Sequence, residues 1–276
     1  MITYSVSGIT HIPKVWNFPA GEVGVASHYD ASASSKEYVR IDACIISSDE
    51  VMQLLMLTDS LKRAYFKAEI SLVLGYLPYG RQDRVCNEGE SLSIKVFADL
   101  INSQGYSFVK LFDPHSYVSE ALFNRCTVVR QHEIFSSLFL RKIPVNSRDV
   151  LIAPDLGAAA KIYDIQKRTA YKEVMVAHKQ RDMATGWITD YKFDGDVEGK
   201  HCTVVDDLIC GGMTFILLGK ALKEAGAKSI TLCATHGIFS KGHEVVAKWY
   251  DNVYTTNSYH KERIGEIEGV NYIGII

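Results

Sequence analysis

The sequence lacks the signatures that mark several large classes of protein. None of its six cysteines stands in a C-x-x-C pair, which argues against a disulfide framework and against a zinc site. No apolar run reaches the length of a membrane span, and the first residues, MITYSVSGITHIPKVW, lack the basic start and continuous apolar core of a signal peptide. We therefore expect a cytoplasmic protein.

An excess of charge of one sign is also absent. The formal net charge is −2 at pH 7, and no block of like charges is present that could hold a nucleic-acid backbone or an acidic membrane. Neither nucleic acid nor a membrane is therefore an expected partner. The 276 residues suffice for two domains of ordinary size, yet no low-complexity linker divides them.

What the sequence does contain is an alternation of short apolar runs with helix-length segments. Apolar residues recur at helical spacing in 50–66 and 91–103, and the alternation predicts an α/β fold with a mostly parallel sheet. One series of strands and helices ends near 125–130 and another begins, which predicts domains over 1–128 and 129–276. The runs that we interpret as strands are 43–47, 70–76, 108–112, 149–154, 174–178, 203–207 and 229–235.

The stretch TVVDDLICGGMTF (203–215) has the pattern of a strand, a glycine loop and the start of a helix. Glycines let backbone N–H groups close around an anion, and the helix N-terminus adds a favourable dipole, so phosphate is the expected anion. Asp206 and Asp207 would repel phosphate, but carboxylates accept hydrogen bonds from sugar hydroxyls. The stretch therefore predicts a sugar-phosphate site. Aspartate also commonly opens helices, so the loop alone is equally compatible with a capping pair.

Polar clusters follow several of the predicted strands. Because ligands bind at the C-terminal ends of strands in open α/β sheets, these clusters are candidate site residues. Taken singly, His115 suits a structural histidine, and Lys179 and Arg181 suit solvated charges. The clusters are GYLPYGRQDR, DPH, PDLG, HKQRD and DD, in chain order.

In this order the clusters resemble those of ribose-phosphate diphosphokinase, also called phosphoribosyl pyrophosphate (PRPP) synthetase. PYGRQDR resembles the family's RQD segment, FDPHS its D-x-H segment, and APDLGAAAK its PD-x-G-G motif. HKQR resembles its K-x-R catalytic loop, VVDDLICGGMTF its ribose-phosphate loop, and ATHGIFS is close to identical to the family form. One such motif would be weak support, whereas six in register, over nearly the whole chain from Asn17, are strong support.

The resemblance implies two similar domains of the type I phosphoribosyltransferase-like fold, each with a mostly parallel central sheet. It also implies transfer of the diphosphoryl group of ATP to the anomeric hydroxyl of ribose 5-phosphate, with release of AMP and a requirement for Mg²⁺. ATP is expected on the N-terminal side and ribose 5-phosphate at the C-terminal loop. A homo-oligomer is the expected assembly.

The resemblance also assigns roles to individual residues. Lys179 and Arg181 are expected to stabilise the transferring phosphoryl group, and His115 and Asp155 to lie at the metal. The residues expected to bind ATP are Phe18, Glu22, Arg81, Gln82, Asp83 and His115. Those expected to bind ribose 5-phosphate are Asp206, Asp207, Cys210, Gly211, Gly212, Met213 and Thr214.

Departures from the family pattern leave alternatives open. In the family loop D-D-x-x-D-T-G-G-T, this chain has Cys210 for the third aspartate, Gly211 for the first threonine and Met213 for the second glycine. One phosphate-binding hydroxyl is therefore missing, which predicts weaker ribose 5-phosphate binding or an altered sugar preference. A non-catalytic regulatory relative is the first alternative. A phosphoribosyltransferase is the second, although that class does not need the RQD segment or the FPAGE segment at residues 18–22.

Overall fold

The computed structural model describes residues 1–28, 38–181 and 188–275. The chain divides into two compact units, Met1–Val129 and Arg130–Ile275. In the described ranges, no helix combines the length and the hydrophobicity needed to cross a bilayer.

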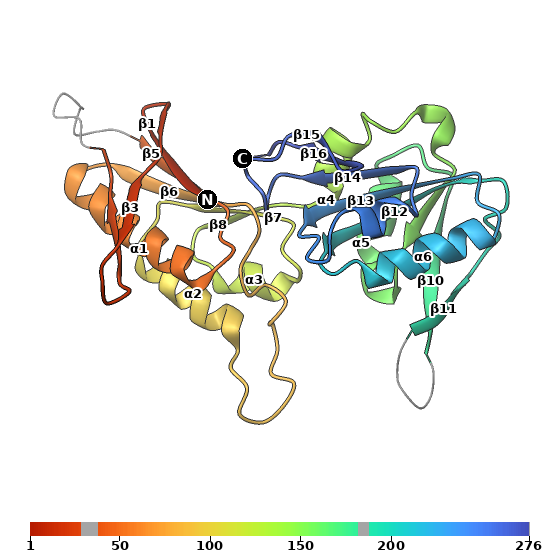
Figure 1. Cartoon of the computed structure of the whole chain (residues 1–276), viewed down its shortest axis with the longest axis horizontal. Helices are drawn as coiled ribbons and strands as arrows, with labels where there is room; N and C mark the ends of the chain where they lie inside the picture. Colours follow the sequence, from red (N-terminus) through yellow and green to blue (C-terminus); the bar gives the residue numbers. More distant parts are fainter. Residues whose placement is uncertain (29–37, 182–187, 276) are drawn as a thin grey trace. The chain divides into compact units, whose positions relative to one another are not determined.

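The first unit is built, within the described residues, on a six-stranded sheet with the order β2-β1-β5-β6-β7-β8 (Figure 1). Strands β5 to β8 run parallel, whereas β1 pairs antiparallel with both β2 and β5. A separate hairpin is formed by β3 and β4. The strands are β1 (Ile2–Val6), β2 (Ile9–His11), β3 (Lys14–Asn17), β4 (Val23–Ala26), β5 (Tyr38–Ala43), β6 (Glu69–Leu74), β7 (Val109–Phe112) and β8 (Cys126–Val129); the helices are α1 (Ser48–Ala64), α2 (Ser93–Ser103) and α3 (Tyr117–Leu122).

The start of α1 shortens the strand predicted at 43–47. Strand β5 ends at Ala43, because the Ser47 hydroxyl accepts a hydrogen bond from the Glu50 N–H (3.3 Å) and caps the helix. Residues 44–47 therefore form the connection between the strand and the helix. The helices predicted at 50–66 and 91–103 correspond to α1 and α2, with ends that differ by about two residues, the usual uncertainty of helix boundaries.

The second unit has an eight-stranded sheet in the described part, with the order β11-β10-β9-β12-β13-β14-β16-β15. Its strands run parallel from β10 to β16, and the outer pairs β10–β11 and β15–β16 are antiparallel. The strands are β9 (Val150–Ala153), β10 (Glu173–Arg181), β11 (Ile188–Phe193), β12 (His201–Ile209), β13 (Ser229–Gly237), β14 (Asn252–Thr256), β15 (Gly265–Ile267) and β16 (Val270–Ile273). The helical segments are α4 (Gln131–Ile134), a π-helical turn (Phe135–Phe139), a 3₁₀ turn (Val145–Ser147), α5 (Leu156–Lys167), α6 (Met213–Glu224) and α7 (Glu244–Ala247).

Each unit has its own hydrophobic core. In the first unit, Leu54 and Leu61 of α1 and Phe97 of α2 are buried with Ile41 and Leu72 of the sheet. The second unit buries Leu218 and Leu222 of α6 with the central strands β12 and β13. In each core, the apolar residues that recur at helical spacing pack on the continuous apolar runs of the parallel strands.

Replacing Leu54 by alanine should lower the free energy of unfolding by about 3 kcal/mol, because a fully buried leucine leaves both lost contacts and a cavity. Urea denaturation of the whole chain measures the change. Met56 lies on the same helix but is 42% exposed, so Met56→Ala should cost less than about 1 kcal/mol. Equal losses in the two variants would contradict the assignment of this face to the core.

Candidate active site

In the first unit, four predicted ATP-binding residues lie around one cavity of about 590 Å³. Arg81, Gln82 and Asp83 lie in the loop that follows β6, and His115 follows β7. Strands β6 and β7 are neighbouring parallel strands, so the segments that leave their carboxyl ends meet at one edge of the sheet. The remaining lining residues are Arg84, Cys86, Glu90, Ser91 and Ser93.

Asp83 lines the cavity, but its side chain is largely buried against the protein. Its side chain is 4% exposed and accepts a hydrogen bond from Arg84 Nε at 3.1 Å. Burial raises the pKa of Asp83, but the polar contacts of its carboxylate, including that with Arg84, outweigh burial and leave the pKa below its ordinary value. Arg81 is exposed at the cavity, so its guanidinium suits an anion.

Phe18 and Glu22 lie in the turn between β3 and β4. The Phe18 N–H donates to the Glu22 carbonyl (2.8 Å), and Gly21, with φ of +99°, closes the turn. The Phe18 ring is 50% exposed and meets Trp16 edge-on, with centroids 5.9 Å apart. Glu22 lines a second cavity of about 280 Å³ with Asp49, Met52 and Met56, among others. The structure therefore places Glu22 on a different cavity from Arg81, and Phe18 lines neither of the two cavities.

In the second unit, Asp155 and Lys179 form an ion pair. Asp155 follows β9 and caps α5, accepting from the Ala158 N–H at 3.1 Å. Strand β10 continues beyond the end of its parallel neighbour β9, which brings Lys179 Nζ to 2.8 Å from Asp155 Oδ2. Burial raises the pKa of Asp155, but Lys179 and the N–H groups of α5 outweigh burial, and the pKa is lowered. Arg181 ends β10, and its side chain lies outside the described residues.

Asp206 and Asp207 lie inside a strand rather than in the glycine loop. Strand β12 continues to Ile209, because its parallel pairing with β13 extends past both aspartates. The Asp207 N–H donates to Asp206 Oδ1 at 2.9 Å, so the Asp206 carboxylate turns toward the second aspartate. Burial, and then the negative charge of Asp207, raise the pKa of Asp206 well above its ordinary value, and Asp155 contributes in the same direction. The carboxyl edge of this sheet therefore concentrates negative charge.

The glycine loop leads directly into α6. Gly212 has φ of +80°, and a Cβ built on it would lie 2.4 Å from Val246 Cγ2, so only glycine fits there. The residue at this helix start has no side chain to cap the first N–H groups, which leaves them available to an anion. Gly211 has room for a side chain, since the nearest atom to its built Cβ lies at 3.8 Å. Met213 and Thr214 form the first turn of the helix.

Sequence reasoning missed two residues beside this loop. The Ser240 N–H donates to the Cys210 carbonyl at 3.1 Å, and Lys241 Cε lies 3.8 Å from the Cβ built on Gly211. Lys241 is exposed, so it adds a cation beside the predicted phosphate site. The signal for both was the ATHGIFS segment that the family resemblance had already marked, since Ser240 ends it and Lys241 follows it directly.

Comparisons with known proteins assign the chain to a family. The N-terminal domain of ribose phosphate pyrophosphokinase matches residues 9–105, and a phosphoribosyl synthetase-associated domain matches residues 159–267. The ribose-phosphate pyrophosphokinase of Mycoplasmopsis pulmonis is 32% identical over 235 residues, covering 82% of this chain and 72% of its own length. The one from Pyrococcus abyssi is 31% identical over 267 residues, covering 94% of this chain and 88% of its own length. The chain belongs to the ribose-phosphate pyrophosphokinase family.

A solved structure shows the same fold. Phosphoribosylpyrophosphate synthetase from Mycobacterium smegmatis superposes with a TM-score of 0.79 at 24% identity, covering 95% of this chain and 86% of its own. Family and fold therefore confirm the resemblance and the two-part α/β architecture predicted from the sequence. As a member of the ribose-phosphate pyrophosphokinase family, the chain keeps the family's strand-end motifs while departing from it in the glycine loop.

Gly212→Ala should lower the free energy of unfolding by roughly 2 kcal/mol or more, because the added methyl group forces a strained φ and overlaps Val246. Gly211→Ala is the matched control and should change stability by less than about 1 kcal/mol, because its Cβ enters open space. Chemical denaturation of both variants measures the difference. A control that costs as much as Gly212→Ala would contradict the loop conformation.

Proposed function

We propose that this chain transfers the diphosphoryl group of ATP to the anomeric hydroxyl of ribose 5-phosphate, which gives PRPP and AMP. The observation that carries the proposal is the carboxyl edge of the second unit's sheet. The chain belongs to the ribose-phosphate pyrophosphokinase family. At this edge, neighbouring strands and the segments that follow them carry Lys179, the carboxylates of Asp155 and Asp206, and a glycine loop at a helix start. Diphosphoryl transfer needs such a set, because it depends on positioning and on stabilising developing negative charge.

Ribose 5-phosphate is proposed to bind at the start of α6. The N–H groups of the loop and of the first helical turn would hold the 5-phosphate, with contributions from Cys210, Gly211, Gly212, Met213 and Thr214. Asp206 and Asp207 would accept hydrogen bonds from the ribose hydroxyls. The raised pKa of Asp206 supports this role, because sugar hydroxyls or a cation would relieve the crowding of negative charge.

ATP is proposed to bind in the first unit. Arg81, Gln82 and His115 would contact the nucleotide and its phosphates from the 590 Å³ cavity, while Asp83 fixes Arg84 beside them. Phe18 is exposed enough to stack on the adenine base, and the Glu22 carboxylate could accept from the amino group of adenine.

Mg²⁺ is the proposed cofactor, and the residues present fit it. No three histidine, cysteine, aspartate or glutamate side chains in the described ranges gather into a metal cage. Mg²⁺ usually uses one or two carboxylates together with substrate phosphates and water, and the crowded carboxylates of the second unit suit it. Asp155 is the proposed direct ligand in the second unit. When bound, the ion would neutralise charge on the transferring phosphates.

Lys179 and Arg181 are proposed to stabilise the transferring group. The contact of Lys179 with Asp155 keeps the ammonium at the edge of the sheet, where a phosphate oxygen can compete with the carboxylate for it. Asp155 therefore holds the lysine in position before the substrate arrives.

We also propose a cytoplasmic homo-oligomer, since ATP and ribose 5-phosphate are cytoplasmic metabolites and the resemblance implies assembly. Sedimentation velocity would contradict the assembly if the purified chain stayed monomeric at every concentration tested. Cell fractionation would contradict the location if the chain sedimented with membranes.

A non-catalytic regulatory relative is the second candidate. The open space at Gly211 favours it, because the hydroxyl that the family pattern places there is missing. The Lys179–Asp155 pair opposes it, since a relative without activity would not need to keep that pair.

Purified protein with ATP, Mg²⁺ and ribose 5-phosphate should yield AMP and a diphosphate attached to the sugar carbon, both visible by ³¹P NMR. Lys179→Ala should lower turnover by at least about 100-fold while ATP affinity stays within about twofold, because the lysine acts on the transition state. Lys172→Ala is the matched control, since Lys172 pairs with Asp149 at the opposite end of β10. Removal of Mg²⁺ by EDTA should abolish the reaction.

Unchanged turnover in Lys179→Ala would contradict the role given to that lysine. If the wild-type chain bound ATP without forming either product, the non-catalytic relative would be favoured. Cys210→Asp combined with Gly211→Thr would then test whether the altered loop is the cause, because the structure leaves room for a side chain at Gly211.

A further inference from the structure

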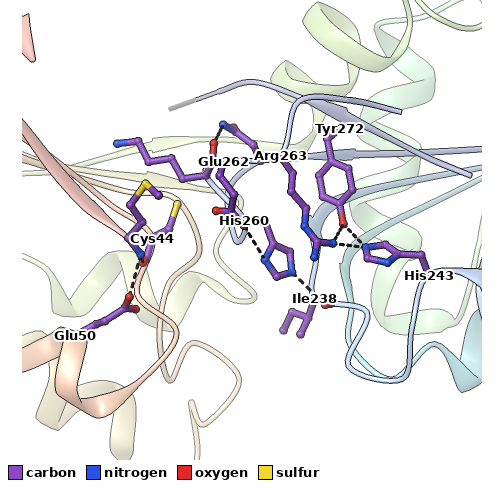
Figure 2. A network of polar contacts seen from close by, with 11 residues as sticks. Cys44, Glu50, Ile238, His243, His260, Glu262, Arg263 and Tyr272 are labelled. Atoms are coloured by element: carbon purple, nitrogen blue, oxygen red, sulfur yellow. Dashed lines mark hydrogen bonds and ion pairs between the residues drawn. The ribbon is translucent and has the colours of Figure 1, made fainter. Parts of the chain in front are cut away.

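A buried histidine in the second unit is hydrogen-bonded on both of its ring nitrogens. His243 Nδ1 lies 2.8 Å from Glu268 Oε2. His243 Nε2 lies 2.6 Å from the Tyr272 hydroxyl and 2.5 Å from Arg263 Nη1 (Figure 2). The histidine is only 6% exposed. Its partners come from β16 and from the segments on either side of β15, so one side chain joins several parts of the C-terminal region.

These contacts determine which nitrogen carries the proton. Arginine can only donate, so Nε2 must accept from Arg263 Nη1, and the proton lies on Nδ1, which donates to Glu268. The Tyr272 hydroxyl lies 2.6 Å from Nε2, whose single lone pair it shares with Arg263, and it also accepts from Arg263 Nη1 at 3.2 Å. The network uses one neutral tautomer of His243, which a simple apolar replacement cannot reproduce.

The network lies behind the predicted phosphate-binding loop. The His243 carbonyl caps α7 by accepting from the N–H groups of Val246 and Ala247, the last two residues of this short helix. Val246 is the residue that closes over Gly212. A second link joins His260 to the end of β12. His260 Nε2 lies 3.4 Å from the Ile238 carbonyl (Figure 2), and the Ile238 N–H donates to the carbonyl of Ile209, the last residue of β12. Burial, and then the nearby Arg263 charge, lower the pKa of His260, which favours its neutral form.

We propose that His243 is a positioning residue for the ribose 5-phosphate loop, an inference that rests on the proposed function of that loop. By holding α7 against the C-terminal strands, His243 keeps Val246 over Gly212 and so keeps Gly212 in the left-handed conformation from which α6 starts. The loop N–H groups then point at the phosphate before it binds. This support comes from residues that are distant from the loop in sequence, and none of them is among the residues proposed to bind the substrate.

The proposal predicts a selective loss of sugar-phosphate binding. His243→Ala should raise the KM for ribose 5-phosphate about tenfold, because a small displacement of a binding loop costs one to two orders of magnitude. The KM for ATP and kcat should stay within about twofold, since the proposed ATP residues belong to the first unit. His243→Gln should recover about half of the loss on a logarithmic scale, because its amide oxygen can accept from Arg263 and Tyr272.

Two further variants separate positioning from general stability. Tyr272→Phe keeps the buried ring and removes only the hydroxyl, with its contacts to His243 and Arg263, so it should raise the same KM by roughly threefold. His201→Ala is the matched control: His201 bonds Ser229 at the opposite end of β12, and its loss should leave the KM for ribose 5-phosphate unchanged. A KM for ribose 5-phosphate within twofold of wild type in both His243→Ala and Tyr272→Phe would overturn the proposal. So would equal increases in the KM for ATP and for the sugar.

Equilibrium binding keeps this test independent of turnover. Isothermal titration with ribose 5-phosphate alone should show about tenfold weaker binding to His243→Ala than to wild type, even if the wild-type chain forms no product. Absence of product with this difference retained would reject the proposed reaction and keep the positioning role. Product formation with unchanged sugar affinity would reject the positioning role alone.

Discussion

The parallel pairing of β9, β10 and β12 is the constraint on which the second unit's site depends. Neighbouring parallel strands end at the same edge of a sheet, so whatever follows them meets in space. The lengths of the strands then matter, because β10 and β12 run on past the end of β9. That difference brings Lys179 beside Asp155 and places Asp206 within electrostatic range of the same carboxylate.

Charge at this edge is unevenly balanced. Asp155 has a cationic partner and a helix N-terminus, and both stabilise its ionised form. Asp206 has burial and a neighbouring carboxylate, and both oppose ionisation. A site arranged in this way binds a cation or a set of hydroxyl donors favourably, whereas it would repel a phosphate placed directly at Asp206. The start of α6, where backbone N–H groups replace carboxylates, is therefore the site that we propose for the phosphate.

The glycine loop shows how a departure from a family pattern acquires physical meaning. Gly212 is required by its φ angle and by the approach of Val246, so any other residue would be strained at this position. Gly211 is under no such restriction, and the threonine of the family pattern is absent where a side chain would fit. Phosphate binding at this loop is therefore proposed to depend more heavily on backbone N–H groups and on the packing behind the loop. The His243 network is part of that packing.

The sequence alone determined the α/β class, the family and the strand-end positions of the polar clusters, because apolar periodicity and short motifs are local properties of the chain. It predicted α1 and α2 closely but continued the strand before α1 to residue 47, since a capping serine is a weak signal beside an apolar run. It ended the strand of the second unit at the aspartates, whereas pairing with β13 carries it to Ile209. Only the tertiary structure brought together Lys179 and Asp155, which are 24 residues apart, and joined His243 to Tyr272 and Arg263. Those contacts depend on strand length, register and side-chain direction, which are settled when the sheet assembles and leave no mark in local sequence spacing.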